Sequence, residues 1–189
     1  MVISKKIYDE FILVANELFK KDFLNIGIGS ISLKLKADKM LINKRNKHIT
    51  EEDFILMVNI LRENMQWEEA SEDIKIHSEI YKTYSNTKTI ANIFPKNVLS
   101  YVEQKNVNEF IPSDFMGKTY LNQIPIITIK NLQEWEENSE FIITKALKNN
   151  NIVIVKGFGV FIKSRDIREI IKLSTILENS AYILLNKGE

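Results

Sequence analysis

Residues 71–95, SEDIKIHSEIYKTYSNTKTIANIFP, place an amphipathic helix, a buried strand and the start of a second helix in direct succession. Ser71 is a favourable N-cap for the first helix, because its hydroxyl can accept a hydrogen bond from a free backbone N–H. One side of that helix carries a stripe at three- and four-residue spacing, formed by Ile74, His77, Ile80, Tyr81 and Tyr84. The apolar run at 89–94 predicts a buried strand, and Pro95 suits the start of the next helix. This succession indicates an α/β fold.

The alternation of helix and strand continues toward the N-terminus. Residues 4–21 have apolar side chains at helical spacing behind a serine cap, which predicts a helix. Segment 26–36 alternates apolar and polar residues, which is the period of a half-buried strand, and 40–43 is its expected hairpin partner. The apolar run at 54–61 fits either a strand or a helix.

The C-terminal half follows the same pattern. Residues 132–147 have helical periodicity, with a kink or break expected near Asn138 and Ser139. Further predicted elements are a strand at 124–130, a strand–turn–strand at 151–162 and a final helix at 166–186. Two hairpins among alternating helices and strands predict a mixed sheet with helices on its faces, in one domain over residues 1–189.

Composition excludes several classes of function. The 189 residues include 26 Lys and Arg, 25 Asp and Glu, no Cys and two His. Such a balanced charge creates no field that attracts nucleic acid or an anionic membrane, so we expect neither as a partner. Without Cys, and with two His, one subunit cannot form a thiolate or three-His zinc site. Charges within the first apolar stretch differ from a signal peptide, so we expect a cytoplasmic location.

Two glycine pairs superficially resemble phosphate-binding loops. Neither 27–29 (GIG) nor 157–159 (GFG) completes GxGxxG or lies between a strand and a helix, so both are interpreted as tight turns. The basic run 44–47 could hold an anion, although a solvated turn is favoured.

The two histidines have different predicted roles. His77 could be a general base oriented by a carboxylate one turn upstream, but a buried, hydrogen-bonded histidine is favoured. His48 lies in a charged turn and is expected to be exposed.

Several short strings, in this order, resemble the class II aldolase/adducin family, which includes fuculose-phosphate aldolase. They are GSIS (29–32), LINKRN (41–46), SEDIKIH (71–77) followed by Tyr81, ANIFP (91–95), VKGFG (155–159) and the final helix with Leu177, Glu178 and Ala181. The resemblance implies a three-layer α/β/α fold with a mixed, mostly antiparallel central sheet. It also implies a homo-oligomer, most plausibly a tetramer.

The same resemblance implies that the family's metal is lost. The family holds a divalent ion, usually zinc, with three histidines, and their positions here are Asn92, Phe94 and Phe158. A phenyl ring has no lone pair for a metal. We therefore expect no metal site and no cofactor.

The family's other functional positions are also altered. Its catalytic acid/base glutamate corresponds to Asp73, a shorter and vestigial acid. Its ligand-binding positions correspond to Gly29, Ser30, Asn43, Lys44 and Ser71. Glu72 stands where the family has a second serine, and its charge opposes a sugar phosphate.

Two hypotheses follow for the function. The first is a degenerate, metal-free family member without aldolase activity, acting by oligomeric assembly or by binding an unidentified small molecule or protein. The alternative is an aldolase-type lyase or epimerase acting on a sugar or sugar phosphate, with a site rebuilt around Asp73, His77 and Lys156.

Overall fold

The structure, a computed structural model, describes residues 3–187, and its elements follow the predicted alternation. The strands are β1 (Ser30–Lys36), β2 (Lys39–Asn43), β3 (Ile55–Asn59), β4 (Thr89–Ile93), β5 (Glu109–Phe110), β6 (Ile124–Ile127), β7 (Ile152–Val155) and β8 (Gly159–Ser164). The helices are α1 (Lys5–Lys20), α2 (Gln66–Glu69), α3 (Ile74–Thr83), α4 (Lys96–Lys105), α5 (Phe115–Tyr120), α6 (Leu132–Ala146) and α7 (Ile167–Asn186). The ambiguous run at 54–61 is therefore a strand. Within the described residues, no helix has the length and apolarity needed to cross a bilayer.

The strands form one sheet in the order β3-β2-β1-β4-β8-β7-β6-β5. All neighbouring strands are antiparallel except β6 and β7, which are parallel. In the central strand β4, Asn92 lies opposite Ser30 of β1 on one side and opposite Phe161 of β8 on the other. The mixed, mostly antiparallel sheet is confirmed.

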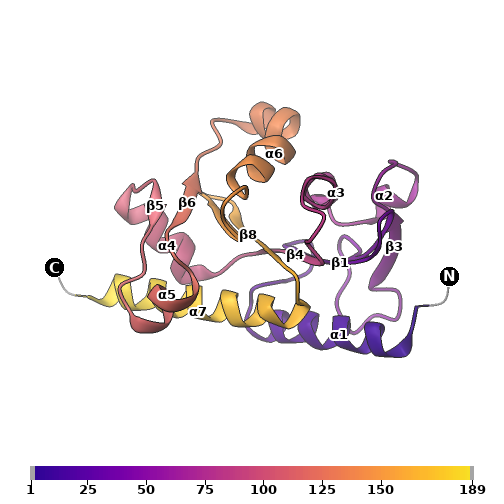
Figure 1. Cartoon of the computed structure of the whole chain (residues 1–189), viewed down its shortest axis with the longest axis horizontal. Coiled ribbons are helices and arrows are strands. Elements are labelled where there is room, and N and C mark those ends of the chain that lie inside the picture. Colours follow the sequence, from indigo (N-terminus) through magenta and orange to yellow (C-terminus); the bar gives the residue numbers. More distant parts are fainter. Residues whose placement is uncertain (1–2, 188–189) are drawn as a thin grey trace.

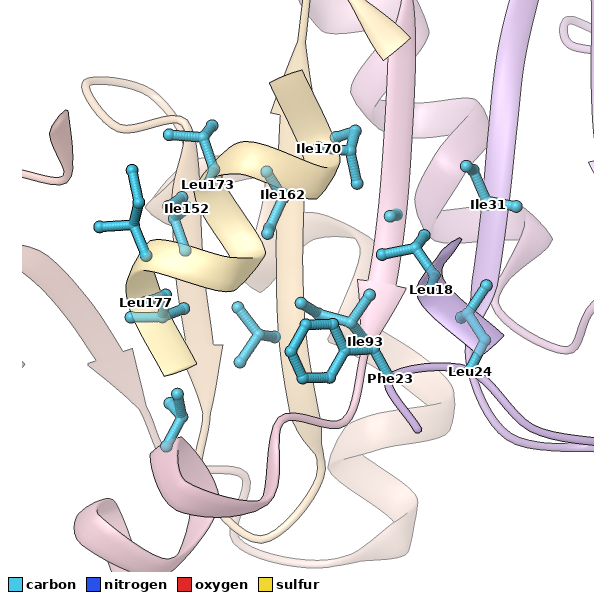
Figure 2. Close-up of a cluster of buried hydrophobic side chains, with 14 of the residues drawn as sticks. Leu18, Phe23, Leu24, Ile31, Ile93, Ile152, Ile162, Ile170, Leu173 and Leu177 are labelled. Carbon is cyan, nitrogen blue, oxygen red and sulfur yellow. The ribbon is translucent and has the colours of Figure 1, made fainter. Parts of the chain in front are cut away.

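Side chains of the central strands point alternately to the two faces of the sheet, and both faces are buried. In β4, Ala91 and Ile93 belong to one apolar cluster, whereas Ile90 belongs to the other. Figure 1 shows α1 and α7 along one face and α2, α3 and α6 over the other. Figure 2 shows Leu18 of α1 and Leu177 of α7 in the same apolar cluster as the strand residues Ile31, Ile93 and Ile152. The three-layer arrangement is confirmed.

The break predicted in the helix over 132–147 is wrong. Helix α6 is continuous from Leu132 to Ala146, and Asn131 caps it by accepting a hydrogen bond from the backbone N–H of Glu134 (2.9 Å). Ser139 is buried and Asn138 is exposed, so both are accommodated on suitable faces of an unbroken helix.

The predicted side-chain cap at Ser71 is also wrong. Helix α3 begins at Ile74, and Asp73 occupies the N-cap position without a side-chain capping bond. The backbone N–H of Ser71 donates to the carbonyl of Asn43 (3.1 Å). This bond holds Ser71 beside the end of β2 and outside the helix.

Candidate functional site

A cavity of about 500 Å³ lies beyond one end of four neighbouring interior strands, where β2 and β4 end and β1 and β8 begin. The start of α3 and the first half of α6 also contribute to its lining. Four of the five predicted ligand-binding residues line this cavity, together with the predicted acid Asp73: Gly29, Asn43, Lys44 and Ser71. The fifth, Ser30, is fully buried and contacts Asp73 from β1. The sheet thus brings together residues that are far apart in sequence.

A buried polar ladder, formed by Ser30, Ser32, Asp73, His77 and Tyr81, joins β1 to α3. The Ser30 hydroxyl donates to Asp73 Oδ2 and lies 2.8 Å from His77 Nε2. Ser32 Oγ lies 2.7 Å from His77 Nδ1 and 2.9 Å from the Tyr81 hydroxyl.

Helix and strand periodicities explain why this ladder stays in register. Four helical residues rise about 6 Å, and two strand residues rise about 6.6 Å. Side chains at positions 73, 77 and 81 of one helix face therefore match positions 30 and 32 of one strand face. Each histidine nitrogen obtains a partner, and the interpretation of His77 as a buried, hydrogen-bonded residue is confirmed.

Asp73 is an ionised carboxylate at the inner wall of the cavity. Burial alone would raise the pKa of Asp73, but the charge of His77 and hydrogen bonds from His77 and Ser30 outweigh it and lower that pKa to about 2. Only 6% of Asp73 is exposed, and its Oδ1 atom has no hydrogen-bond partner. Burial raises the pKa of Tyr81, at the other end of the ladder, well above its usual range.

The basic loop beside the cavity is bound to other parts of the protein. Lys44 Nζ pairs with Glu69 (2.8 Å) and Asp53 (3.3 Å), and the hydrogen bond to Glu69 is the main reason why the pKa of Lys44 is raised. The backbone N–H groups of Lys44 and Arg45 donate to the carbonyls of Phe54 and Glu69. These donors are therefore not available to a phosphate.

An aromatic wall, defined as Phe94, Trp135 and Phe158, forms another side of the cavity. The Phe158 ring lies 4.0 Å from that of Trp135 and 5.8 Å from that of Phe94, measured between centroids. All three side chains are half-buried. Sequence reasoning missed Trp135, although it lies one turn from Ser139 on α6, and this spacing places both residues on the helix face that lines the cavity.

The positions that the resemblance assigns to zinc ligands do line the cavity, but their side chains do not fit zinc. Asn92 has one amide, whereas Phe94 and Phe158 have only phenyl rings. Protein zinc sites use imidazole, thiolate or carboxylate groups. In residues 3–187, no group of three or more His, Cys, Asp or Glu side chains is placed to hold a metal ion.

Two other sequence predictions need correction. Lys156 does not join Asp73 and His77, because its ammonium lies 3.5 Å from Asn106 Oδ1 and the residue is not part of the cavity lining. His48 is half-buried rather than exposed, with its ring edge-on to Phe19 at 5.2 Å.

The glycine pairs form turns, as predicted. Gly27 and Gly157 both have φ near 71°, in the left-handed region. Gly159 has a different constraint: an added Cβ would lie 2.8 Å from Asn92 Oδ1, so a larger residue there would disturb the cavity.

Comparisons with known proteins agree with this architecture. A family model described as "Class II Aldolase and Adducin N-terminal domain" matches residues 9–185. No curated protein sequence matches the chain significantly.

Solved structures show the same fold. The L-fuculose-1-phosphate aldolase of Thermus thermophilus has a TM-score of 0.83 at 23% identity, covering 95% of this chain and 94% of that chain. YgbL of Escherichia coli has a TM-score of 0.81 at 13% identity, covering 97% and 90%. A sugar-phosphate aldolase of Thermotoga maritima has a TM-score of 0.73 at 20% identity, covering 93% and 92%.

Proposed function

The chain belongs to the class II aldolase and adducin family, and on that premise we propose that it is a metal-free member without aldolase activity. In this proposal it acts by binding a ligand in the cavity and by oligomeric assembly. The observation that carries the proposal is the aromatic pair at two of the three zinc-ligand positions. Phe94 and Phe158 pack with each other and with Trp135, and none of these side chains can polarise a sugar carbonyl.

The basic loop supports the loss of sugar-phosphate binding. A phosphate needs free N–H donors and uncompensated cations. Here Lys44 is paired with two carboxylates, and the neighbouring backbone N–H groups already donate to carbonyls. Exposed Glu72 lines the same cavity and would repel an anion.

Elemental analysis and an aldol-cleavage assay test the proposal together. We expect far less than one zinc, manganese or iron ion per chain after dialysis against a mild chelator. We also expect no cleavage of L-fuculose 1-phosphate, with or without added zinc. A tightly held divalent ion, or metal-dependent cleavage, would contradict the proposal.

One observation favours the alternative of an enzyme with a rebuilt site. Asp73 lines the cavity at the position of the family's acid/base residue and could accept a proton there, although its pKa of about 2 makes it a weak base at neutral pH. If the alternative is correct, the purified protein without metal will cleave or epimerise sugars, and Asp73→Asn will abolish that activity. Absence of both activities supports the first proposal.

Assembly as a homo-oligomer, most plausibly a tetramer, is the second part of the proposal. Support comes from exposed apolar side chains in and before α5, notably Phe115 at 81% and Ile111 at 60% exposure. Burying such a surface against another copy would remove it from water. Light scattering should give a mass several times that of one chain, and a monomer across the micromolar range would contradict this part. A cytoplasmic location remains a prediction from the sequence.

A further inference from the structure

The charges that line the cavity favour a cation over an anion. Four acidic residues line it, Glu72, Asp73, Glu136 and Glu140, against three basic ones, Lys44, Arg45 and Lys75. Lys44 does not alter this balance strongly, because Asp53 and Glu69, which do not line the cavity, already pair with it.

Glu72, which precedes α3, and Glu136 and Glu140 of α6 lack such compensation. Among the ion pairs of residues 3–187, none includes Glu72, Glu136 or Glu140. Arg45 and Lys75 are both exposed and are likewise in none of them, so they are the two cations that oppose the field of these three acids.

Two acceptor atoms of the inner wall lack a donor. Asp73 Oδ1 and Asn92 Oδ1 are both buried and have no hydrogen-bond partner. Both residues line the cavity, so each offers an acceptor atom there without a donor, while the ionic charge of Asp73 is offset by His77. An ammonium group has only N–H donors and suits such a wall, whereas a phosphate has only acceptors at neutral pH.

The aromatic wall supplies the second half of the recognition. Phe94, Trp135 and Phe158 present half-buried ring surface to the cavity. Aromatic faces attract cations electrostatically within about 6 Å of the ring centroid and also remove apolar ligand surface from water. A volume of about 500 Å³ is enough for a single-ring organic molecule.

The geometry points to a binding site for an organic cation, in which an ammonium group faces Glu72 and the two acids of α6 and a flat apolar part packs on the aromatic wall. This inference rests on the proposed function, because it identifies the ligand class of the same cavity. The claim that the cavity binds neither metal nor phosphate is nevertheless separate from the claim that it binds an ammonium group, and each can fail alone.

Three single-ring probes of similar size and different charge test the inference: 2-phenylethylammonium, 3-phenylpropionate and neutral 2-phenylethanol. Binding is measured by calorimetry and by the fluorescence of Trp135, one of two tryptophans in the chain. We expect the cation to bind at least about tenfold more tightly than the anion, with the alcohol between them. Trp135→Phe should remove the fluorescence change, because the other tryptophan, Trp67, is not part of the cavity lining.

Variants on α6 and α3 test the charges directly. Glu136→Gln combined with Glu140→Gln should weaken binding of the cation by about tenfold. Glu137→Gln is the matched control, because Glu137 is exposed on the same helix but does not line the cavity. Lys75→Gln, which removes one of the two opposing charges, should strengthen binding of the cation by about threefold.

Each outcome decides the inference. Equal or tighter binding of the anion, preference for the alcohol or for unphosphorylated L-fucose, or no binding of any probe at about 10 mM, would overturn it. Equal effects of the Glu136/Glu140 and Glu137 variants would also overturn it. These results leave metal content and aldol cleavage untouched, so failure here is distinct from failure of the proposed function.

Discussion

Two clusters lie side by side here, the polar ladder, of which only Asp73 lines the cavity, and the aromatic wall, and they differ in how far their side chains are buried. On the polar ladder, the side chains of Ser30, Ser32, His77 and Tyr81 are buried and hydrogen-bonded to one another. On the aromatic wall, the rings are only half-buried, and their exposed surface faces the cavity. We therefore expect the ladder to contribute to stability and the aromatic wall to contribute to ligand binding.

This contrast shows that polar residues in a cavity are not by themselves evidence of catalysis. The ladder resembles a catalytic relay in composition, but its two histidine nitrogens are both engaged by serines and His77 is fully buried. Its groups stabilise one another in the low dielectric of the interior. Mutations in the ladder should therefore change stability, and mutations in the aromatic wall should change binding.

Replacing His77 should have the largest effect on stability. His77→Leu leaves two serine hydroxyls and the ionised Asp73 without a shared partner in the core. We expect a loss of about 3–5 kcal/mol in the free energy of unfolding. Urea denaturation measures it, with His48→Leu as the control, since half-buried His48 should cost less than about 1 kcal/mol. Similar losses for the two variants would mean that the ladder is not a special source of stability.

Placing histidine at the three zinc-ligand positions of the family tests the aromatic wall, because it replaces two of the three rings. The triple variant Asn92→His, Phe94→His and Phe158→His removes two half-buried phenyl rings, and we expect a loss of about 2 kcal/mol in unfolding free energy. It should also bind zinc weakly, because three imidazoles would line one cavity without groups to orient them.

The control for this variant is the unmodified protein. Calorimetric zinc titration follows only after circular dichroism shows that the triple variant is folded. If the folded triple variant bound no more zinc than the unmodified protein, the three positions would not converge on one point in solution.

Much of the fold could be predicted from the sequence, because burial on one or two faces imposes periods of 2 and 3.6 on the chain. The strands at 89–94 and 151–162 and the helix at 166–186 are examples. Individual side-chain and backbone contacts were harder to predict than the elements. The sequence pattern does not show that Ser71 bonds to the end of β2 instead of capping α3, since that contact joins residues 28 positions apart.

The candidate site could be predicted only where its residues belong to recognisable sequence strings. Residues in the motif-like strings, such as Asp73 and Asn92, were identified because their order matched a family pattern. Trp135 belongs to none of those strings, and only the packing of α6 beside α3 brings it to the cavity. Lys156 was wrongly grouped with Asp73 and His77. Its place in the sequence, at the turn between β7 and β8, does not show which side of the sheet its side chain lies on.

The pH dependence of stability tests whether Asp73 belongs to the ladder. Its pKa, lowered from 3.8 to about 2 in the folded protein, means that its stabilising contribution is complete above about pH 4. That contribution should be lost as the pH falls through about 2, and it amounts to roughly 2 kcal/mol. Urea denaturation between pH 2 and 5 measures it. Asp73→Asn should lack this part of the pH dependence, and identical profiles for the two proteins would contradict the assignment.

Releasing Lys44 should have the smallest effect on stability and a clear effect on binding. Asp53→Asn with Glu69→Gln removes both partners of its ammonium, and both of these carboxylates are largely exposed. Exposed ion pairs contribute little, so the free energy of unfolding should fall by less than about 1 kcal/mol.

The freed ammonium of Lys44 would then add a cation to the cavity lining, where Glu72 and the two acids of α6 now dominate. Binding of 2-phenylethylammonium should weaken, and inorganic phosphate should begin to bind, because an uncompensated ammonium attracts an anion. Glu51→Gln is the control, since Glu51 pairs with Lys47 and not with Lys44. Calorimetric titration of both variants with 2-phenylethylammonium and with inorganic phosphate measures the difference. If the double variant and the control bound both probes equally, the pairing of Lys44 would not be what excludes phosphate, and the negative charge of the cavity would need another origin.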